Sequence, residues 1–277
     1  MFDKLKIYRG SDIQINSKII IKQPTLDQIV EFGERDYFGA VHNLVSVGAD
    51  LKWQLWDMGI DYTTIDDYDL FLTLTYQLVS SKRRMLEIAE NKAEFDEDIQ
   101  QQLASISSDE KVKMQRNPLE LITNIDFGDF EPCKVESTQQ IVLYNQADDI
   151  TIDRALYHQM IDLVRQIHGF KRNNELPANE STKMDLIEDA RDEAMASQHK
   201  PYQSVLRPLV SYMKIINNQC GTDQIWNMKV NEFFYDLKKS GGMREAEMLL
   251  KGAYSGFASL KGVDTDKLNM LGDIETF

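Results

Sequence analysis

The sequence is poor in the residues that most often carry out chemistry or cross-link a fold. Its 277 residues include only two cysteines, Cys133 and Cys220, and four histidines. The cysteines are far apart and form no CxxC pair, which argues against a disulfide scaffold and predicts reduced thiols inside a cell. Apolar runs such as Ile19–Ile21 are far shorter than the ~20 residues of a membrane-spanning helix. The first residues lack the apolar run of a signal peptide, so we expect a cytoplasmic protein.

Positive charge is also scarce. Lysine and arginine together number 31 against 45 aspartates and glutamates, which gives a net charge of −14 and a pI near 4.8. Binding to nucleic acid or to an anionic membrane needs clustered basic side chains. We therefore predict neither nucleic acid nor membrane as a partner. The hydrophobic share of 42% is typical of a soluble protein with a packed core.

Catalytic and cofactor motifs with a fixed spacing are missing as well. We find no HExxH, GxSxG, GxGxxG or P-loop pattern. His158 and His168 are ten residues apart, which would place them on different sides of one helix, so no metal pair is expected. The prediction is a protein without catalytic residues, metal or cofactor, and therefore not an enzyme.

One group of carboxylates, at Asp61, Asp66, Asp67 and Asp69, resembles a cation site more than any other stretch. It lacks the alternating ligands, central glycine and terminal glutamate of an EF-hand loop. We interpret these residues as caps and first-turn acids of a helix. Two less favoured alternatives stay open: an enzyme that acts on nucleic acid or cell wall, and an inhibitor that mimics DNA with surface carboxylates.

Residues 1–80 predict an α+β part. Branched and apolar residues in Leu5–Tyr8 and Asp12–Lys22 favour strands of a hairpin or small sheet. Thr25 and Gln28 have the spacing of a capping box, which predicts a helix that ends near Gly33. Apolar residues at helical spacing predict three further helices, through residues 38–45, 51–58 and 66–78.

Residues 81–118 differ in character, because they are mostly charged or amide residues with a sparse apolar series. We interpret this segment as a polar helical connector or insertion. The alternative is an extended helix that pairs with a partner.

Residues 119–277 predict a mostly helical part with a short β element near residues 120–145. The expected strands are Ile122–Phe127 and Gln140–Tyr144. Apolar stripes predict helices through 152–167, 184–194, 205–216 (with Ser204 as its N-cap), 222–237 (broken by Gly241 and Gly242), 243–250 and 265–271. The predicted fold class is therefore mainly α with small β elements, with an α+β N-terminal part and a helical C-terminal part.

The most aromatic of these stripes includes Trp226, Phe233 and Phe234. Methionines, which suit both cores and adaptable binding surfaces, also concentrate in the C-terminal part. Two interpretations stay open for the three aromatic residues. They belong to the core, or they bind a partner through an apolar surface that the surplus negative charge keeps in solution.

Several stretches together resemble one protein family. They are Lys18–Phe38, Leu55–Leu72, Asn179–Ile187 and Leu249–Gly256, which lie in order along almost the whole chain outside the polar segment. In these stretches the chain is similar to tail assembly chaperone-like proteins of tailed phages and prophages of Gram-positive bacteria.

The resemblance implies an assembly factor in the host cytoplasm that binds the tape-measure protein, with the tail-tube protein as a second partner. It brings no catalytic residues with it. A homo-oligomer is left open. The alternative function is a structural protein of the virion, in the baseplate or the head-to-tail connector.

Overall fold

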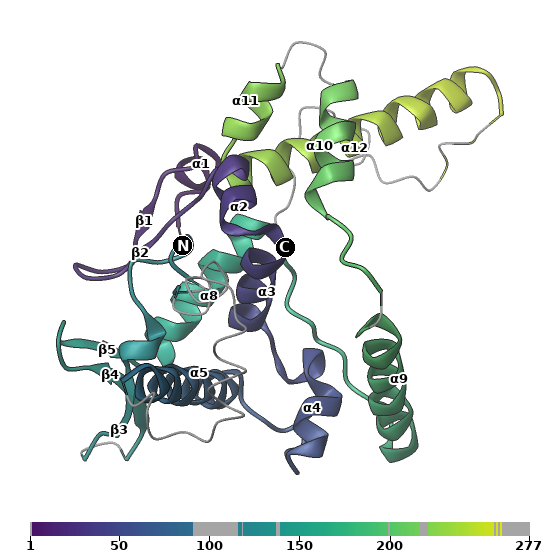
Figure 1. Cartoon of the computed structure of the whole chain (residues 1–277). Coiled ribbons are helices and arrows are strands. Elements are labelled where there is room, and N and C mark those ends of the chain that lie inside the picture. Colours follow the sequence, from purple (N-terminus) through teal and green to yellow (C-terminus); the bar gives the residue numbers. More distant parts are fainter. Residues whose placement is uncertain are drawn as a thin grey trace.

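A computed structural model describes residues 2–90, 116–117, 119–136, 139–198, 200–216, 221–257, 259 and 261. Most of the predicted connector and the predicted helix 265–271 lie outside these residues. Within them, helices dominate and only two small sheets form, which confirms the predicted fold class (Figure 1). No helix of the described part is both long and apolar enough to cross a membrane.

The chain begins with a short helix, α1 (Lys4–Tyr8). The predicted strand at Leu5–Tyr8 is therefore wrong, because the Asp3 carboxylate accepts hydrogen bonds from the Leu5 and Lys6 amides and caps a helical turn. The next apolar residues do form the expected hairpin, β1 (Ile13–Gln14) with β2 (Ile20–Ile21).

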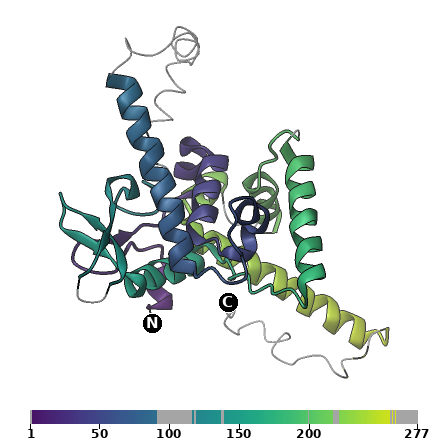
Figure 2. The same cartoon turned by 90° about the horizontal axis from the view of Figure 1, so that it is seen from below.

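Helices follow as the sequence predicts. They are α2 (Leu26–Phe32), α3 (Glu34–Val45), α4 (Lys52–Asp57) and α5 (Asp67–Glu90), with a 3₁₀ turn η1 (Gly48–Asp50) before α4. The capping box is confirmed, since the Gln28 amide donates to Thr25 Oγ1 at 3.2 Å and the Thr25 amide donates to Gln28 Oε1 at 2.9 Å. Gly33, at φ +114°, separates α2 from α3. The far end of α5 projects from the body (Figure 2).

A three-stranded antiparallel sheet follows, with the order β3 (Glu131–Lys134), β4 (Ile141–Asn145), β5 (Ile150–Ile152). The strand predicted at Ile122–Phe127 is wrong. That stretch leads into a 3₁₀ turn, η2 (Phe127–Asp129), which the Asp126 side chain caps by accepting from the Gly128 amide at 2.8 Å.

The remaining helices are α8 (Arg154–His168), α9 (Glu180–Gln198), α10 (Leu206–Ile216), α11 (Thr222–Asn227) and α12 (Val230–Tyr254). The predicted start of α8 at residue 152 is wrong, since Ile152 belongs to β5 and Asp153 caps the helix. The N-cap of α10 is confirmed, because the Arg207 amide donates to Ser204 Oγ at 2.9 Å.

The single helix predicted through residues 222–237 is in fact two. Met228 and Lys229 are extended between α11 and α12, where Lys229 forms a β-bridge with Thr25. The break predicted at Gly241 and Gly242 is also wrong, and the helix predicted at residues 243–250 is part of α12. Two helical glycines cost roughly 2 kcal/mol relative to alanine, yet the helix runs through them without a break.

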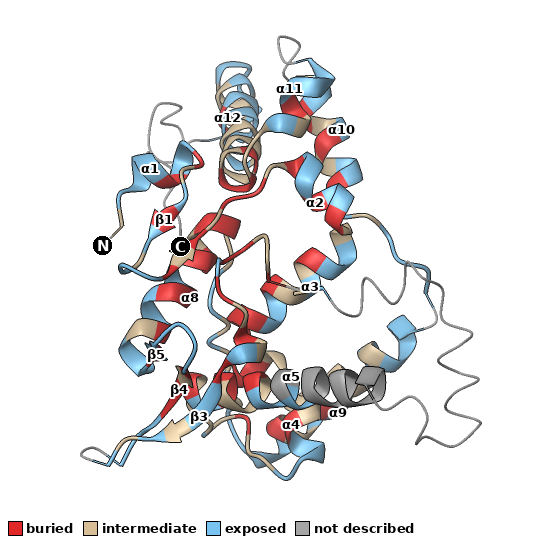
Figure 3. Cartoon of the chain, turned by 60° about the vertical axis from the view of Figure 1, so that its left-hand side comes forward, coloured by how far each residue is buried: buried red, intermediate tan, exposed pale blue. Residues whose placement is uncertain are grey.

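One large hydrophobic cluster runs from Ile7 to Phe233 and draws side chains from both predicted parts of the chain. Buried residues concentrate on α8 and α3 at its centre (Figure 3). Two backbone hydrogen bonds beside the β-bridge join distant segments: the Leu26 amide donates to the Met228 carbonyl and the Val230 amide to the Pro24 carbonyl. The division into parts at residues 80 and 118 stays a prediction.

Candidate binding surface

An apolar pocket of about 310 Å³ lies between α3, α5 and η2. Three polar residues, Asn43, Thr75 and Gln77, line it. The rest of its wall is apolar and comprises Ala40, Leu44, Leu51, Phe71, Leu74, Leu119 and Phe127. A mostly apolar concavity with a few polar groups is the usual form of a binding site for apolar side chains or ligands.

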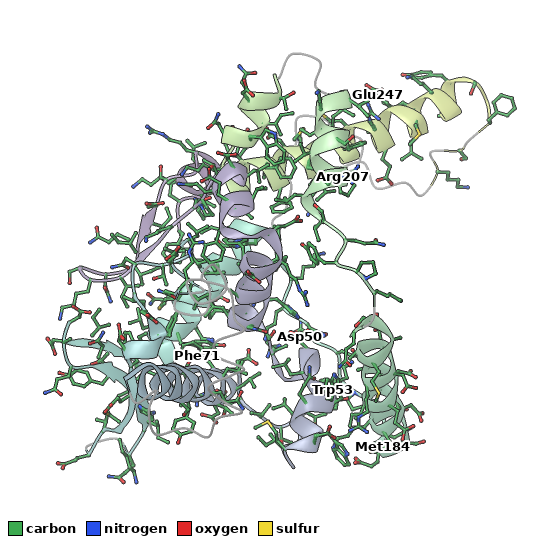
Figure 4. The ribbon with its side chains drawn as sticks, viewed as in Figure 1. Asp50, Trp53, Phe71, Met184, Arg207 and Glu247 are labelled. Carbon is green, nitrogen blue, oxygen red and sulfur yellow. The ribbon has the colours of Figure 1, made fainter. Side chains whose placement is uncertain are left out.

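Packed aromatic rings hold the inner wall of the pocket in place. The Phe71 ring (labelled in Figure 4) lies 4.7 Å from the Tyr157 ring and 5.5 Å from the Phe127 ring, measured between centroids. One turn earlier on α5, the Tyr68 hydroxyl donates to the Ile152 carbonyl at 2.8 Å. The beginning of α5 is thus anchored to α8 and the sheet, which presents Leu74 to the pocket from a rigid helix.

The three predicted partner-binding aromatics lie elsewhere and do not line this pocket. Phe233 is fully buried in the main core, so the core interpretation holds for it. Trp226 and Phe234 are half-buried and pack against the same core, with Phe234 edge-on to Phe38 at 6.3 Å. A role of Trp226 and Phe234 in partner binding stays a prediction.

The acidic stretch is engaged by basic residues from distant parts of the chain. Asp61 pairs with Lys183 of α9 at 2.8 Å, and this hydrogen bond lowers the pKa of Asp61 to about 2. Around it, α4 and α9 enclose a second small cluster that includes Leu55 and Ile187. Trp53 of α4 and Met184 of α9, both labelled in Figure 4, pack against that cluster.

The other acidic residues of this stretch act at the start of α5. Asp66 accepts from the Tyr68 amide at 2.8 Å and pairs with Arg154. Asp67 lies in the first turn and pairs with Arg172 at 3.0 Å. This confirms the interpretation as caps and first-turn acids for Asp66, Asp67 and Asp69. It is wrong for Asp61, which accepts from the Thr63 amide and pairs with Lys183. Among the residues that the structure describes, no three His, Cys, Asp or Glu side chains converge as metal ligands would.

The sequence did not single out the pocket. Leu44, Phe71 and Leu74 belong to apolar helix stripes, and a stripe alone does not tell whether a neighbour covers it completely. The one local signal is the presence of Asn43 and Thr75 beside those stripes. A polar residue beside an apolar stripe indicates that the neighbouring helix does not cover the whole stripe, so that a space remains between the two helices.

Comparisons of this chain with protein-family models, with curated proteins and with solved structures found no match. The family resemblance therefore depends on the sequence stretches alone.

Proposed function

We propose that this chain is a tail assembly chaperone-like factor that binds the tape-measure protein in the host cytoplasm during tail assembly, without catalysis. The observation that carries the proposal is the apolar pocket between α3, α5 and η2. Bulky apolar side chains of a helical client would enter it while the client's backbone lies along α5. A well-desolvated anchor of this kind contributes about 2 kcal/mol or more.

The charge of the chain supports such a role. A protein that offers apolar surface to clients must avoid binding to itself, and a net charge of −14 makes copies repel one another. Exposed apolar side chains such as Met58, Leu176 and Met195 are present on the same molecule. Charge repulsion keeps copies of this chain apart at long range, and the exposed apolar side chains can contact a client at short range. This combination fits a factor that holds a client in solution.

Co-expression with a tape-measure protein of a tailed phage tests the proposal. We expect the two proteins to purify together and the tape-measure protein to shift into the soluble fraction. Mass spectrometry of purified particles then separates the proposal from a virion structural role. A chaperone is absent from particles, whereas a baseplate or connector protein is present in a fixed copy number, and that second result would refute the proposal.

A further inference from the structure

The segment that joins α8 to α9 is bonded to two walls of the apolar pocket. It leaves α8 at Gly169, whose φ of +68° turns the chain, and passes beside η1 and α4 before α9 begins (Figure 1). We call residues 172–175 the strap. Three of its four side chains, those of Arg172, Asn173 and Glu175, bind residues next to the pocket lining.

The first of these walls is formed by Leu51, directly after η1. The residues on both sides of Leu51 bind the strap: Asn173 Nδ2 donates to Asp50 Oδ1 at 2.9 Å, and Lys52 Nζ donates to Glu175 Oε2 at 2.6 Å. The Glu175 amide donates to Asn173 Oδ1 at 3.0 Å and closes a ring of contacts that includes the backbone of Leu51. The Lys52 side chain is only 12% exposed, so water and salt weaken this ion pair less than one on the surface.

The second wall is the beginning of α5. Arg172 binds the Asp67 carboxylate with two hydrogen bonds, from Nε and Nη2, each 3.0 Å long. A bidentate pair of this kind fixes orientation as well as distance. Phe71, which lines the pocket, lies one turn after Asp67, and Leu74 follows on the same helix. The strap spans at most about 11 Å between its first and last Cα atoms, so it holds Leu51 and the α5 wall close together.

We propose that the strap is a clamp that sets the width of the pocket and thereby its affinity for an apolar group. While both contacts are intact, Leu51 and α5 enclose that group. When either contact is broken, Leu51 moves away from α5 and the pocket opens to water. Arg172, Asn173 and Glu175 do not line the pocket themselves, so they are positioning residues. The inference rests on the proposed function in one respect: the apolar group is a side chain of the client.

The neutral dye N-phenyl-1-naphthylamine tests the clamp on the full chain without a client, because its fluorescence rises in apolar surroundings. We expect the wild type to bind the dye in the pocket. Leu74→Glu, which places a charge in the pocket wall, should weaken dye binding at least tenfold. Tyr76→Glu places the same charge at an exposed residue of α5 outside the pocket and should leave the dye affinity unchanged.

Two neighbouring asparagines of the strap provide a matched pair of variants. Asn173→Asp places a carboxylate against that of Asp50, and the repulsion between like charges should weaken dye binding at least fivefold. Asn174→Asp is the control. The Asn174 side chain already accepts a hydrogen bond from Arg172, so a carboxylate there gains an ion pair and the dye affinity should stay the same.

Exchange of one ion pair separates a clamp from a mere loss of stability. Lys52→Glu and Glu175→Lys should each weaken dye binding at least fivefold, and the two substitutions together should restore the affinity to within twofold of the wild type. Gly10→Ala, whose Cβ would clash with Lys229 outside the pocket lining, should lower the urea midpoint without changing the dye affinity. Circular dichroism verifies that each variant is folded.

Three results would overturn the inference. They are dye binding that Leu74→Glu does not weaken, an unchanged dye affinity in Asn173→Asp and in both single ion-pair variants, and a double exchange that does not restore the affinity. The dye assay runs without the tape-measure protein. It can therefore succeed or fail independently of the co-expression experiment, which tests the proposed function itself.

Discussion

The Tyr37 hydroxyl lies 2.7 Å from Nε2 of His168 and joins α3 to α8 inside the core. Nδ1 of His168 lies 2.8 Å from the Val164 carbonyl, which can only accept, so Nδ1 carries the proton. Nε2 is then the acceptor and the Tyr37 hydroxyl is the donor. Both side chains are buried, and burial lowers the pKa of His168 to about 4 and raises that of Tyr37.

The His168 pKa predicts a loss of stability in mild acid. In the unfolded chain the pKa of histidine is about 6.5, so between pH 6.5 and pH 4 the unfolded state binds a proton that the folded state rejects. The free energy of unfolding should therefore be unaffected by this group above pH 6.5 and fall by about 2 kcal/mol at pH 5.

Urea unfolding of the wild type and of His168→Gln at pH 7.5 and pH 5 measures this effect. The wild type should lose more stability between the two pH values than the variant does. An identical loss in both proteins would show that folding does not lower the pKa of His168 below its value in the unfolded chain.

Removing the Tyr37 hydroxyl should destabilise the fold. Tyr37→Phe leaves Nε2 of His168 buried without a donor, which costs about 1–3 kcal/mol. Tyr76→Phe is the control, because Tyr76 is exposed on α5. Urea unfolding at pH 7.5 compares the two, and equal midpoints would contradict the assigned hydrogen bond.

Gly10 and Gly59 offer a matched pair of glycines. Both have positive φ, at +74° and +72°, but a Cβ on Gly10 would lie 2.2 Å from Cγ of Lys229, whereas a Cβ on Gly59 meets nothing within 4 Å. Each alanine substitution costs about 1–2 kcal/mol, because a residue with a Cβ is strained at positive φ. Gly10→Ala should cost at least about 1 kcal/mol more in thermal or urea unfolding. Equal costs would mean that the contact between residue 10 and Lys229 is looser than the structure indicates.

Lys183 should hold α9 against α4. Its side chain is 8% exposed and pairs with Asp61 at 2.8 Å. Lys183→Met removes this ion pair and leaves Asp61 with hydrogen bonds from Thr63 only. Amide hydrogen exchange in α9 should become faster. Lys251→Met serves as the control, because its pair with Glu247 is exposed and contributes little. Unchanged exchange in α9 would show that apolar contacts around Ile187 alone fix the helix.

Local signals in the sequence predicted most helices correctly, because caps act over three or four residues. Thr25 with Gln28 and Ser204 with Arg207 behave as their spacing predicts. The strand at Leu5–Tyr8 was mispredicted because the cap at Asp3 outweighs the apolar character of that stretch.

The errors further along the chain have a tertiary cause. Lys229 leaves the helix because its backbone pairs with Thr25, more than two hundred residues away in sequence. The pocket could not be predicted either, because it also depends on contacts between distant segments. The apolar residues Leu44 and Leu74 are visible in the sequence, but whether a space remains between their helices depends on how distant segments pack.

The most direct test of the central claim changes the pocket during co-expression with the tape-measure protein. Leu74→Glu places a charge in the pocket wall, and Tyr76→Glu places the same charge on α5 at an exposed residue that does not line the pocket. We expect the wild type and Tyr76→Glu to pull down soluble tape-measure protein in similar amounts. Leu74→Glu should remain folded but pull down at least tenfold less tape-measure protein than the wild type. Equal capture by both variants, or no capture by the wild type, would contradict the account.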